Sequence, residues 1–525
     1  MDNGEWLMAI SKLYVFGQLV KKNMSKIKKI LIANRGEIAV RIIRTCKEMG
    51  IETVAVFSEP DRKSLHVQFA DEAVALGGNK SSESYLIKEK IIDAAKISGA
   101  DAIHPGYGFL SENAEFAEMV EKAGIIFIGP RPYAIRTMGD KTTARKSLTG
   151  KKVPIAPGTQ DSIDDILEAR KIADGIGYPV LVKASAGGGG KGMRVVYKSE
   201  EFEKSFSASQ NEAKNAFGDS RVYIEKYLEN PRHIEIQVLA DEAGNTVYLF
   251  ERECSIQRRH QKVIEEAPSS VLTPEMRNAI GEAAVEVAKS CNYRGAGTVE
   301  FLVDKHRNFF FLEMNTRLQV EHPVTELITG LDLVREQIRI AEGEELGYKQ
   351  EDLKIHGHSV ECRIYAEDPE SQFLPDTGKL IRHRVPNGLG VRVDAGVEEG
   401  SEISIFYDPM ISKLVVWDKD RPTAIRKMKR ALQEYYISGV RTTIPFCEFV
   451  MDHPKFIEGD FDTHFIQNYF APDSLNVNNK KELTELVASA TQAIHWLEKK
   501  EKSSSQILTH QTENSDLSLW KVRRR

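Results

Sequence analysis

The stretch EMNTRLQVEHPVTE, residues 313–326, holds the densest group of side chains able to do chemistry. Its first ten residues include two carboxylates, two amides, an arginine and a histidine. The apolar run at residues 309–312 leads directly into this stretch and is typical of a β-strand. Because a strand is a rigid support, the sequence predicts that these polar groups are delivered to one site.

A second apolar run precedes the first, and the polar turn between them indicates a β-hairpin. If residues 305–308 form the loop, the register places Glu300 opposite Glu313. The same register places Phe301 opposite Leu312. Like charges at opposite positions of a hairpin are destabilising, and a bound cation would reverse that effect.

Glu300, Glu313 and Asn315 are therefore candidate metal ligands. Asn315 follows Glu313 by two residues, so both side chains share one face of the strand. Two carboxylates and an amide oxygen are hard ligands that suit Mg²⁺ or Mn²⁺ carrying phosphate oxygens. The alternative is that one glutamate is solvated at a strand edge, since the loop length decides the face.

A glycine-rich segment, KASAGGGGKGM at residues 183–193, lies between two strand-like runs. Lys183 enters the loop and Lys191 lies inside it, which favours backbone and side-chain contact with phosphates. It is not a P-loop, because neither serine nor threonine follows Lys191 and a strand follows instead of a helix. We expect a mobile lid, and a flexible linker is the alternative.

Further on, the run ending in RRHQK holds three cationic or potentially cationic groups. If residues 258–262 are extended, Arg258, His260 and Lys262 share one face and form an anion site. A solvated basic strand edge is the alternative interpretation.

The chain begins with a βαβ pattern typical of a parallel α/β domain: a strand at 29–33, a helix at 38–49 and a strand at 53–57. It lacks GxGxxG, so a dinucleotide site is not indicated. Residues 358–417 are rich in strand and turn signals. From Asp473 the chain turns polar, with one possible helix at 482–497.

Composition limits the function classes. The 525 residues are enough for three to four domains, and the net charge of −5 gives no reason to expect a nucleic-acid partner. No apolar run reaches the ~18 residues of a membrane span. The five scattered cysteines predict reduced thiols in the cytoplasm. Residues 1–23 fit neither a secretory signal nor a transit peptide, and we interpret them as an extension.

Taken together, a phosphate loop, a carboxylate metal pair and cationic groups indicate ATP-driven ligation through an acyl-phosphate. A second anion, the phosphoryl acceptor, is expected on Lys262 and Arg317. Glu321 lies near Arg317 in the sequence and is the candidate general base.

The chain closely resembles biotin carboxylase, the ATP-grasp subunit of biotin-dependent carboxylases, from about Lys26 to about Tyr469. The motifs that carry the resemblance are ILIANRGEIA (30–39), HPGYGFLSEN (104–113), MGDK (138–141), KASAGGGGKGM (183–193), EKYLENPRHIEIQ (225–237), RRHQK (258–262), EMNTRLQVEHPVTE (313–326) and ECRIYAEDP (361–369). The resemblance implies an α/β and α+β multidomain fold. Its parts would be a Rossmann-like N-terminal domain (24–138), an ATP-grasp domain (139–345) with a mobile lid at about 155–228, a strand-rich C-terminal domain (346–472) and a polar tail (473–525).

The resemblance also implies roles for individual residues. The metal ligands would be Glu300, Glu313 and Asn315. The ATP contacts would be Lys141, Lys183, Gly189, Gly190, Glu225, Lys226, Leu228, His233 and His260. The bicarbonate site would be Lys262, Arg317, Gln319 and the Val320 backbone. Glu321 would deprotonate bicarbonate, Arg363 would hold the biotin ureido oxygen, and Tyr107 would lie near the biotin.

The same resemblance implies ATP, Mg²⁺ or Mn²⁺ (two ions), and biotin as a carrier-bound substrate. No AMKM biotin-acceptor sequence is present, so we expect the chain to work with a separate biotin carboxyl carrier protein and a carboxyltransferase subunit. The resemblance also implies a homodimer. Acetyl-CoA, propionyl-CoA and pyruvate all stay open as the final acceptor. The rival hypotheses are another ATP-grasp ligase, which would lack ECRIYAEDP, and an inactive homologue, which the filled catalytic positions disfavour.

Overall fold

The computed structural model describes residues 27–475 and 486–496, apart from positions 160, 185–191 and 260. The chain divides into two compact units, residues 1–469 and 470–525. In the second unit, residues 486–496 are helical, as expected for that part of the predicted tail helix. The extension at 1–23 and the four glycines of the phosphate loop lie outside the described residues.

The N-terminal part is a doubly wound parallel sheet with strand order β3-β2-β1-β4-β5. Its strands are β1 (Lys29–Ile32), β2 (Glu52–Phe57), β3 (Glu72–Ala75), β4 (Ala102–His104) and β5 (Ile126–Phe127). Helix α2 (Gly36–Glu48) connects β1 to β2 and buries Ile38, Ile42 and Cys46 against the sheet. The predicted Rossmann-like arrangement is therefore confirmed.

The segment around the glycine-rich loop forms a small lobe with its own apolar core. A three-stranded sheet of order β7-β6-β8 is covered by two helices. The elements are α8 (Ile166–Ile176), β6 (Val180–Ala184), β7 (Arg194–Val196), α9 (Phe202–Phe217) and β8 (Val222–Lys226). The two strands predicted on either side of the loop are β6 and β7, and they pair antiparallel.

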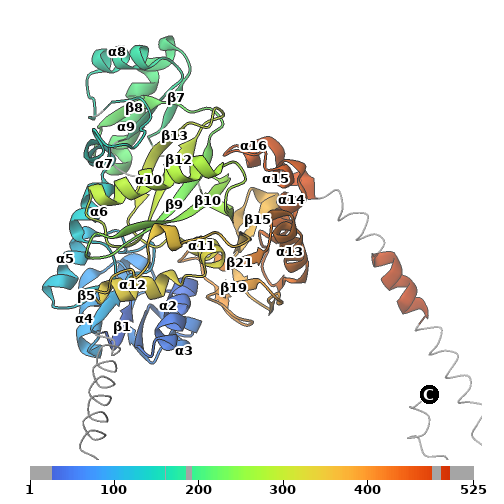
Figure 1. The fold of residues 1–525 in the computed structure, drawn as a ribbon. Helices are drawn as coiled ribbons and strands as arrows, with labels where there is room; N and C mark the ends of the chain where they lie inside the picture. Colours follow the sequence, from blue (N-terminus) through green and yellow to red (C-terminus); the bar gives the residue numbers. More distant parts are fainter. Residues whose placement is uncertain (1–26, 160, 185–191, 260, 476–485, 497–525) are drawn as a thin grey trace, which may run out of the picture. The chain divides into compact units, whose positions relative to one another are not determined.

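The largest sheet has eight antiparallel strands in the order β13-β12-β9-β10-β11-β14-β21-β19. They are β9 (Arg232–Ala240), β10 (Thr246–Arg258), β11 (Gln261–Ala267), β12 (Gly295–Val303), β13 (Phe309–Asn315), β14 (His358–Tyr365), β19 (Val391–Ala395) and β21 (Met410–Asp418). Helix α10 (Pro274–Ser290) crosses one face of it (Figure 1). Because β14 pairs with β11, the C-terminal strands extend the central sheet.

The hairpin of β12 and β13 aligns Glu300 with Glu313, as the sequence predicts. The predicted register also holds for Thr298 and Val299, but it is wrong between Glu300 and the loop, because Phe301 pairs with Phe311 and Leu312 is a bulge. The loop is one residue longer than expected, since the Asp304 carboxylate accepts hydrogen bonds from the backbone N–H groups of residues 306 and 308 at 2.8 Å. The bulge compensates for the extra loop residue and restores the carboxylate pair.

The predicted extended cationic strand at 258–262 is also wrong. Strand β10 ends at Arg258, Arg259 adopts a positive φ of 49°, and β11 returns antiparallel with Gln257 opposite Lys262. Arg258 instead binds Glu367 at 2.7 Å. His260 lies outside the described residues. The turn therefore separates two side chains that an extended strand would place together.

Beyond the sheet, the C-terminal part contains three two-stranded ladders and helix α13 (Arg421–Glu434). The strand-rich character predicted for this part is confirmed. All five cysteines are buried free thiols. In the described part of the chain, every helix is too short or too polar to cross a membrane.

Candidate active site

A cavity of about 1280 Å³ brings together residues from all parts of the first unit. Its lining includes these residues predicted from the sequence: Tyr107, Lys141, Lys183, Glu225, Lys226, Leu228, His233, Lys262, Glu300, Glu313, Asn315, Arg317, Gln319, Val320 and Arg363. Glu321 is fully buried behind this lining. Gly189, Gly190 and His260 lie outside the described residues.

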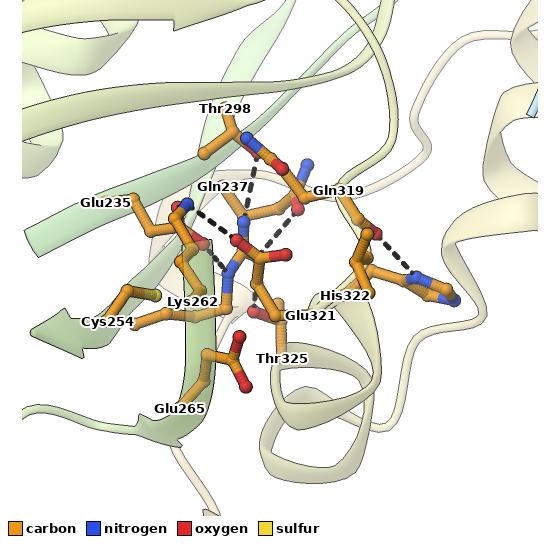
Figure 2. Close-up of polar contacts among 12 residues, drawn as sticks. Glu235, Gln237, Cys254, Lys262, Glu265, Thr298, Gln319, Glu321, His322 and Thr325 are labelled. Atoms are coloured by element: carbon orange, nitrogen blue, oxygen red, sulfur yellow. Dashed lines mark hydrogen bonds and ion pairs between the residues drawn. The ribbon is translucent and has the colours of Figure 1, made fainter. Parts of the chain in front are cut away.

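Glu321 is held by two cations, one at each carboxylate oxygen. Lys262 Nζ binds Oε1 at 2.7 Å and Arg363 Nη2 binds Oε2 at 2.9 Å. Figure 2 shows the carboxylate reaching toward Lys262 from the loop that precedes α11 (His322–Thr329). Burial opposes its ionisation, but the charges of Lys262 and Arg363 outweigh burial and hold the Glu321 pKa well below its usual range.

The Lys262 ammonium also contacts two carboxylates of the central sheet. Lys262 Nζ contacts Glu300 Oε1 at 2.9 Å and also forms an ion pair with Glu235. Its pKa is raised well above the usual value, because these anions outweigh the cost of burial. Lys262 therefore stays charged between the carboxylates of Glu235, Glu300 and Glu321.

The predicted metal ligands lie together on the paired strands. The Glu300 carboxylate lies 3.0 Å from His233 Nε2 and accepts a hydrogen bond from Asn315 Nδ2 at 2.9 Å, whereas the Glu313 carboxylate accepts no hydrogen bond from any described residue. Burial and then the charge of Glu300 raise the Glu313 pKa. A second, half-buried carboxylate without a donor is the environment that a divalent cation stabilises, so these residues fit Mg²⁺ or Mn²⁺.

The segment between β13 and α11 presents a second set of donors. Arg317 Nε binds Glu112 at 2.8 Å, and its two Nη atoms contact the side-chain oxygens of Gln319 at 3.1 Å and Asn315 at 3.2 Å. Gln319 in turn lies 3.3 Å from Glu300 Oε1. The guanidinium is thus oriented by protein acceptors while it lines the cavity, where its positive charge can attract an anion.

The far end of the cavity carries further lysines. Lys183 on β6 forms an ion pair with Glu225 on β8, and Arg145 Nη1 lies 3.2 Å from the other Glu225 oxygen. Lys226 Nζ donates to the carbonyls of Gly177 and Tyr178 at 3.0 Å. These contacts fix the lysine stems of the small lobe at the cavity wall, where they can meet a polyphosphate.

Arg363 connects the base to the C-terminal strands. Besides Glu321, its Nε binds Glu265 at 2.6 Å. Burial raises the pKa of Glu265 to about 7, and Arg363 opposes that shift. Across from this group, the Tyr107 ring lies 5.8 Å from Lys413 Nζ. An aromatic ring therefore lines the same cavity as the arginine that contacts Glu321.

Three family models match the chain: the biotin carboxylase N-terminal domain over residues 26–135, the carbamoyl-phosphate synthase L chain ATP-binding domain over 140–349, and the biotin carboxylase C-terminal domain over 361–468. Biotin carboxylase 1 from Bacillus subtilis is 54% identical over 444 residues, which cover 84% of this chain and 99% of that protein. The chain belongs to the biotin carboxylase family.

Other relatives agree with this membership. A pyruvate carboxylase subunit from Methanothermobacter thermautotrophicus is 56% identical over 84% of this chain and 90% of its own length. The biotin carboxylase domain of Hydrogenobacter thermophilus 2-oxoglutarate carboxylase, solved with MgADP, ADP and bicarbonate, has a TM-score of 0.82 and 49% identity, over 86% of this chain and 99% of that one. A Campylobacter jejuni biotin carboxylase structure matches with the same TM-score and identity, over 85% and 99%.

Sequence reasoning missed two residues in the core of this biotin carboxylase site. Glu235 and Arg252 are fully buried, pair with each other, and connect Lys262 to Thr298 and Thr325. The signal was present, since Glu235 lies between Ile234 and Ile236 on a strand whose residues after Glu235 are apolar or amide. A charged side chain in a fully buried strand needs a partner, and that requirement points to a polar site.

Proposed function

We propose that this chain carboxylates biotin with ATP and bicarbonate, as the first half-reaction of a biotin-dependent carboxylase. The observation that carries the proposal is the Glu321 carboxylate held between Lys262 and Arg363. Lys262 belongs to the anion side of the cavity and Arg363 to the biotin side. A base that touches both can couple the activation of bicarbonate to the carboxylation of biotin.

ATP would bind between the small lobe and the central sheet. Lys141 and Lys183 would neutralise the phosphates, with Glu225, Lys226, Leu228, His233, His260, Gly189 and Gly190 as further contacts. A divalent ion held by Glu300, Glu313 and Asn315 would add positive charge at the transferring phosphoryl group. The small lobe would exclude water, which matters because carboxyphosphate hydrolyses readily.

Bicarbonate would bind on Lys262, Arg317, Gln319 and the Val320 backbone. In the absence of substrate, Glu321 is a weak base because two cations neutralise it. When Lys262 turns to bicarbonate and Arg363 to biotin, this compensation weakens and the Glu321 pKa rises. The carboxylate then accepts the bicarbonate proton as a bicarbonate oxygen attacks the γ-phosphoryl group, whose bond to the bridging oxygen breaks so that ADP leaves.

The resulting carboxyphosphate would break into CO₂ and phosphate inside the cavity. The phosphate would take the N1′ proton of biotin, and the nitrogen would then attack CO₂. Arg363 would stabilise the ureido oxygen as negative charge develops on it, which is electrostatic catalysis by a fixed donor. Tyr107 would lie against the biotin ring.

We further propose that the chain works in the cytoplasm as a homodimer, and that its partners are a biotin carboxyl carrier protein and a carboxyltransferase subunit.

The proposal is tested by ADP release from the purified chain with Mg²⁺ and ATP, with bicarbonate and free biotin each added or omitted. We expect release that requires bicarbonate and rises with biotin. Release that is indifferent to bicarbonate, or that depends on another amine or carboxylate, would contradict the proposal.

A further inference from the structure

Two buried side chains outside the cavity wall hold the backbone on both sides of Val320. Lys413 Nζ on β21 donates to the Val320 carbonyl at 2.8 Å. His322 Nδ1 donates to the Gln319 carbonyl at 2.8 Å, a contact drawn as a dashed line in Figure 2. The carbonyl can only accept, so Nδ1 carries the proton. Both side chains are fully buried.

Each contact also sets the direction of an N–H group. A trans peptide unit is planar, and its C=O and N–H point in opposite directions. The unit whose carbonyl His322 holds contains the N–H of Val320. The unit whose carbonyl Lys413 holds contains the N–H of Glu321. The two consecutive peptide planes that precede the Glu321 side chain are therefore both fixed through their carbonyl oxygens.

Lys413 is held beside Val320 by contacts with several groups. Its ammonium donates to the Val320 carbonyl, forms an ion-pair contact with Glu37 at 3.3 Å and lies 5.8 Å from the centre of the Tyr107 ring. Glu37 and Tyr107 belong to the N-terminal sheet domain, whereas Lys413 lies opposite Arg363 on the neighbouring strand. The ammonium thus joins the anion-binding segment to both flanking domains.

We infer that Lys413 and His322 are positioning residues that aim the Val320 N–H into the anion end of the cavity and fix the backbone of Glu321. This inference rests on the proposed function. Neither side chain belongs to the cavity lining in the described part of the chain, so neither acts on substrate directly. Loss of either should therefore weaken bicarbonate binding and leave ATP binding nearly unchanged.

The experiment compares Lys413→Met and His322→Leu with the unchanged chain, measuring ADP release against bicarbonate and against ATP. We expect each variant to raise the bicarbonate KM on the order of tenfold, the effect of losing one well-placed donor. The ATP KM should stay close to that of the unchanged chain. His322→Asn should restore the bicarbonate KM, because its amide N–H can replace Nδ1.

Lys427→Met is the matched control. Lys427 also donates to a backbone carbonyl, that of Trp417 at 2.7 Å, and pairs with Asp418 at 2.8 Å, but it lies away from the cavity. A bicarbonate KM unchanged in folded Lys413→Met and His322→Leu would overturn the inference, as would an equal change in the control or in the ATP KM. If Lys413→Met does not fold, the His322→Leu and His322→Asn pair decides. Bicarbonate-independent release by the unchanged chain would instead overturn the proposed function.

Discussion

Lys262 and Glu321 form a 2.7 Å ion pair in which the carboxylate has no exposed surface. A buried pair of this kind is weak evidence for stability, because desolvation offsets most of the attraction. Its placement beside Glu300 and Arg363 is better explained by chemistry. In the proposed mechanism, the pair keeps Glu321 ionised and poorly basic until a substrate anion competes for the ammonium.

Replacing Glu321 by glutamine should remove the base and keep the shape of the site. We expect bicarbonate-dependent ADP release to fall by roughly 10²–10⁴-fold, the usual contribution of a positioned general base. Steady-state ADP release measures this. Glu336→Gln is the control, because Glu336 is also buried and paired with an arginine, at 2.9 Å, but lies on α12 (Leu333–Ala341) outside the cavity. An equal loss in both variants would contradict the assignment.

Replacing Glu313 by glutamine should weaken metal binding specifically. The Glu313 carboxylate accepts no hydrogen bond from a described residue, so the amide removes charge without breaking a protein contact. We expect the Mg²⁺ concentration for half-maximal ADP release to rise about tenfold. Mn²⁺ binding, measured by electron paramagnetic resonance, gives a readout independent of activity. Unchanged Mn²⁺ affinity would show that Glu313 is not a ligand.

Replacing Lys262 by methionine should destabilise the fold as well as abolish activity. Without the ammonium, Glu235, Glu300 and Glu321 lose a shared partner. Breaking a buried pair in this way costs about 3–5 kcal/mol. The lost stability should return as the pH falls, because the carboxylates can then take up protons. Chemical denaturation at several pH values checks this, with Lys427→Met expected to lose about 1 kcal/mol or less.

The pH dependence of stability offers a separate test at Glu37. Burial raises the pKa of Glu37 to about 7 from the ordinary value near 4.5. The folded state thus holds this proton more tightly than the unfolded state. The proton on Glu37 therefore adds to the free energy of unfolding. This addition is fully present below pH 4.5, is lost as the pH rises through 7, and amounts to about 3 kcal/mol at most.

Glu37→Gln mimics the protonated acid, so it should be more stable than the unchanged chain at pH 8 and nearly equal at pH 5. Thermal unfolding at both pH values measures the difference. A variant less stable at pH 8 than at pH 5, relative to the unchanged chain, would show that Glu37 is ionised and stabilising.

The sequence predicted the site better than the local geometry around it. The Glu300–Glu313 pair followed from residue type and spacing. The Leu312 bulge did not, because it depends on how Asp304 closes the loop. The reversal after Arg258 was missed because its turn contains neither glycine, proline nor asparagine, and Arg259 takes the positive φ instead.

Long-range pairing was also beyond reach. Arg363 meets Glu321 because β14 joins β11 in one sheet, although about a hundred residues separate those strands along the chain. Glu235 and Arg252 were not predicted, although Glu235 lies between two isoleucines of a strand, because only their complete burial shows that they need polar partners.

The most direct test of the account follows an oxygen atom. The purified chain is supplied with ATP, Mg²⁺, free biotin and bicarbonate labelled with ¹⁸O, and the released phosphate is analysed by mass spectrometry. If bicarbonate attacks the γ-phosphoryl group, one labelled oxygen stays on phosphate when carboxyphosphate breaks down. The account predicts one ¹⁸O per phosphate released. Unlabelled phosphate formed at the same rate would show that water is the acceptor and would contradict it.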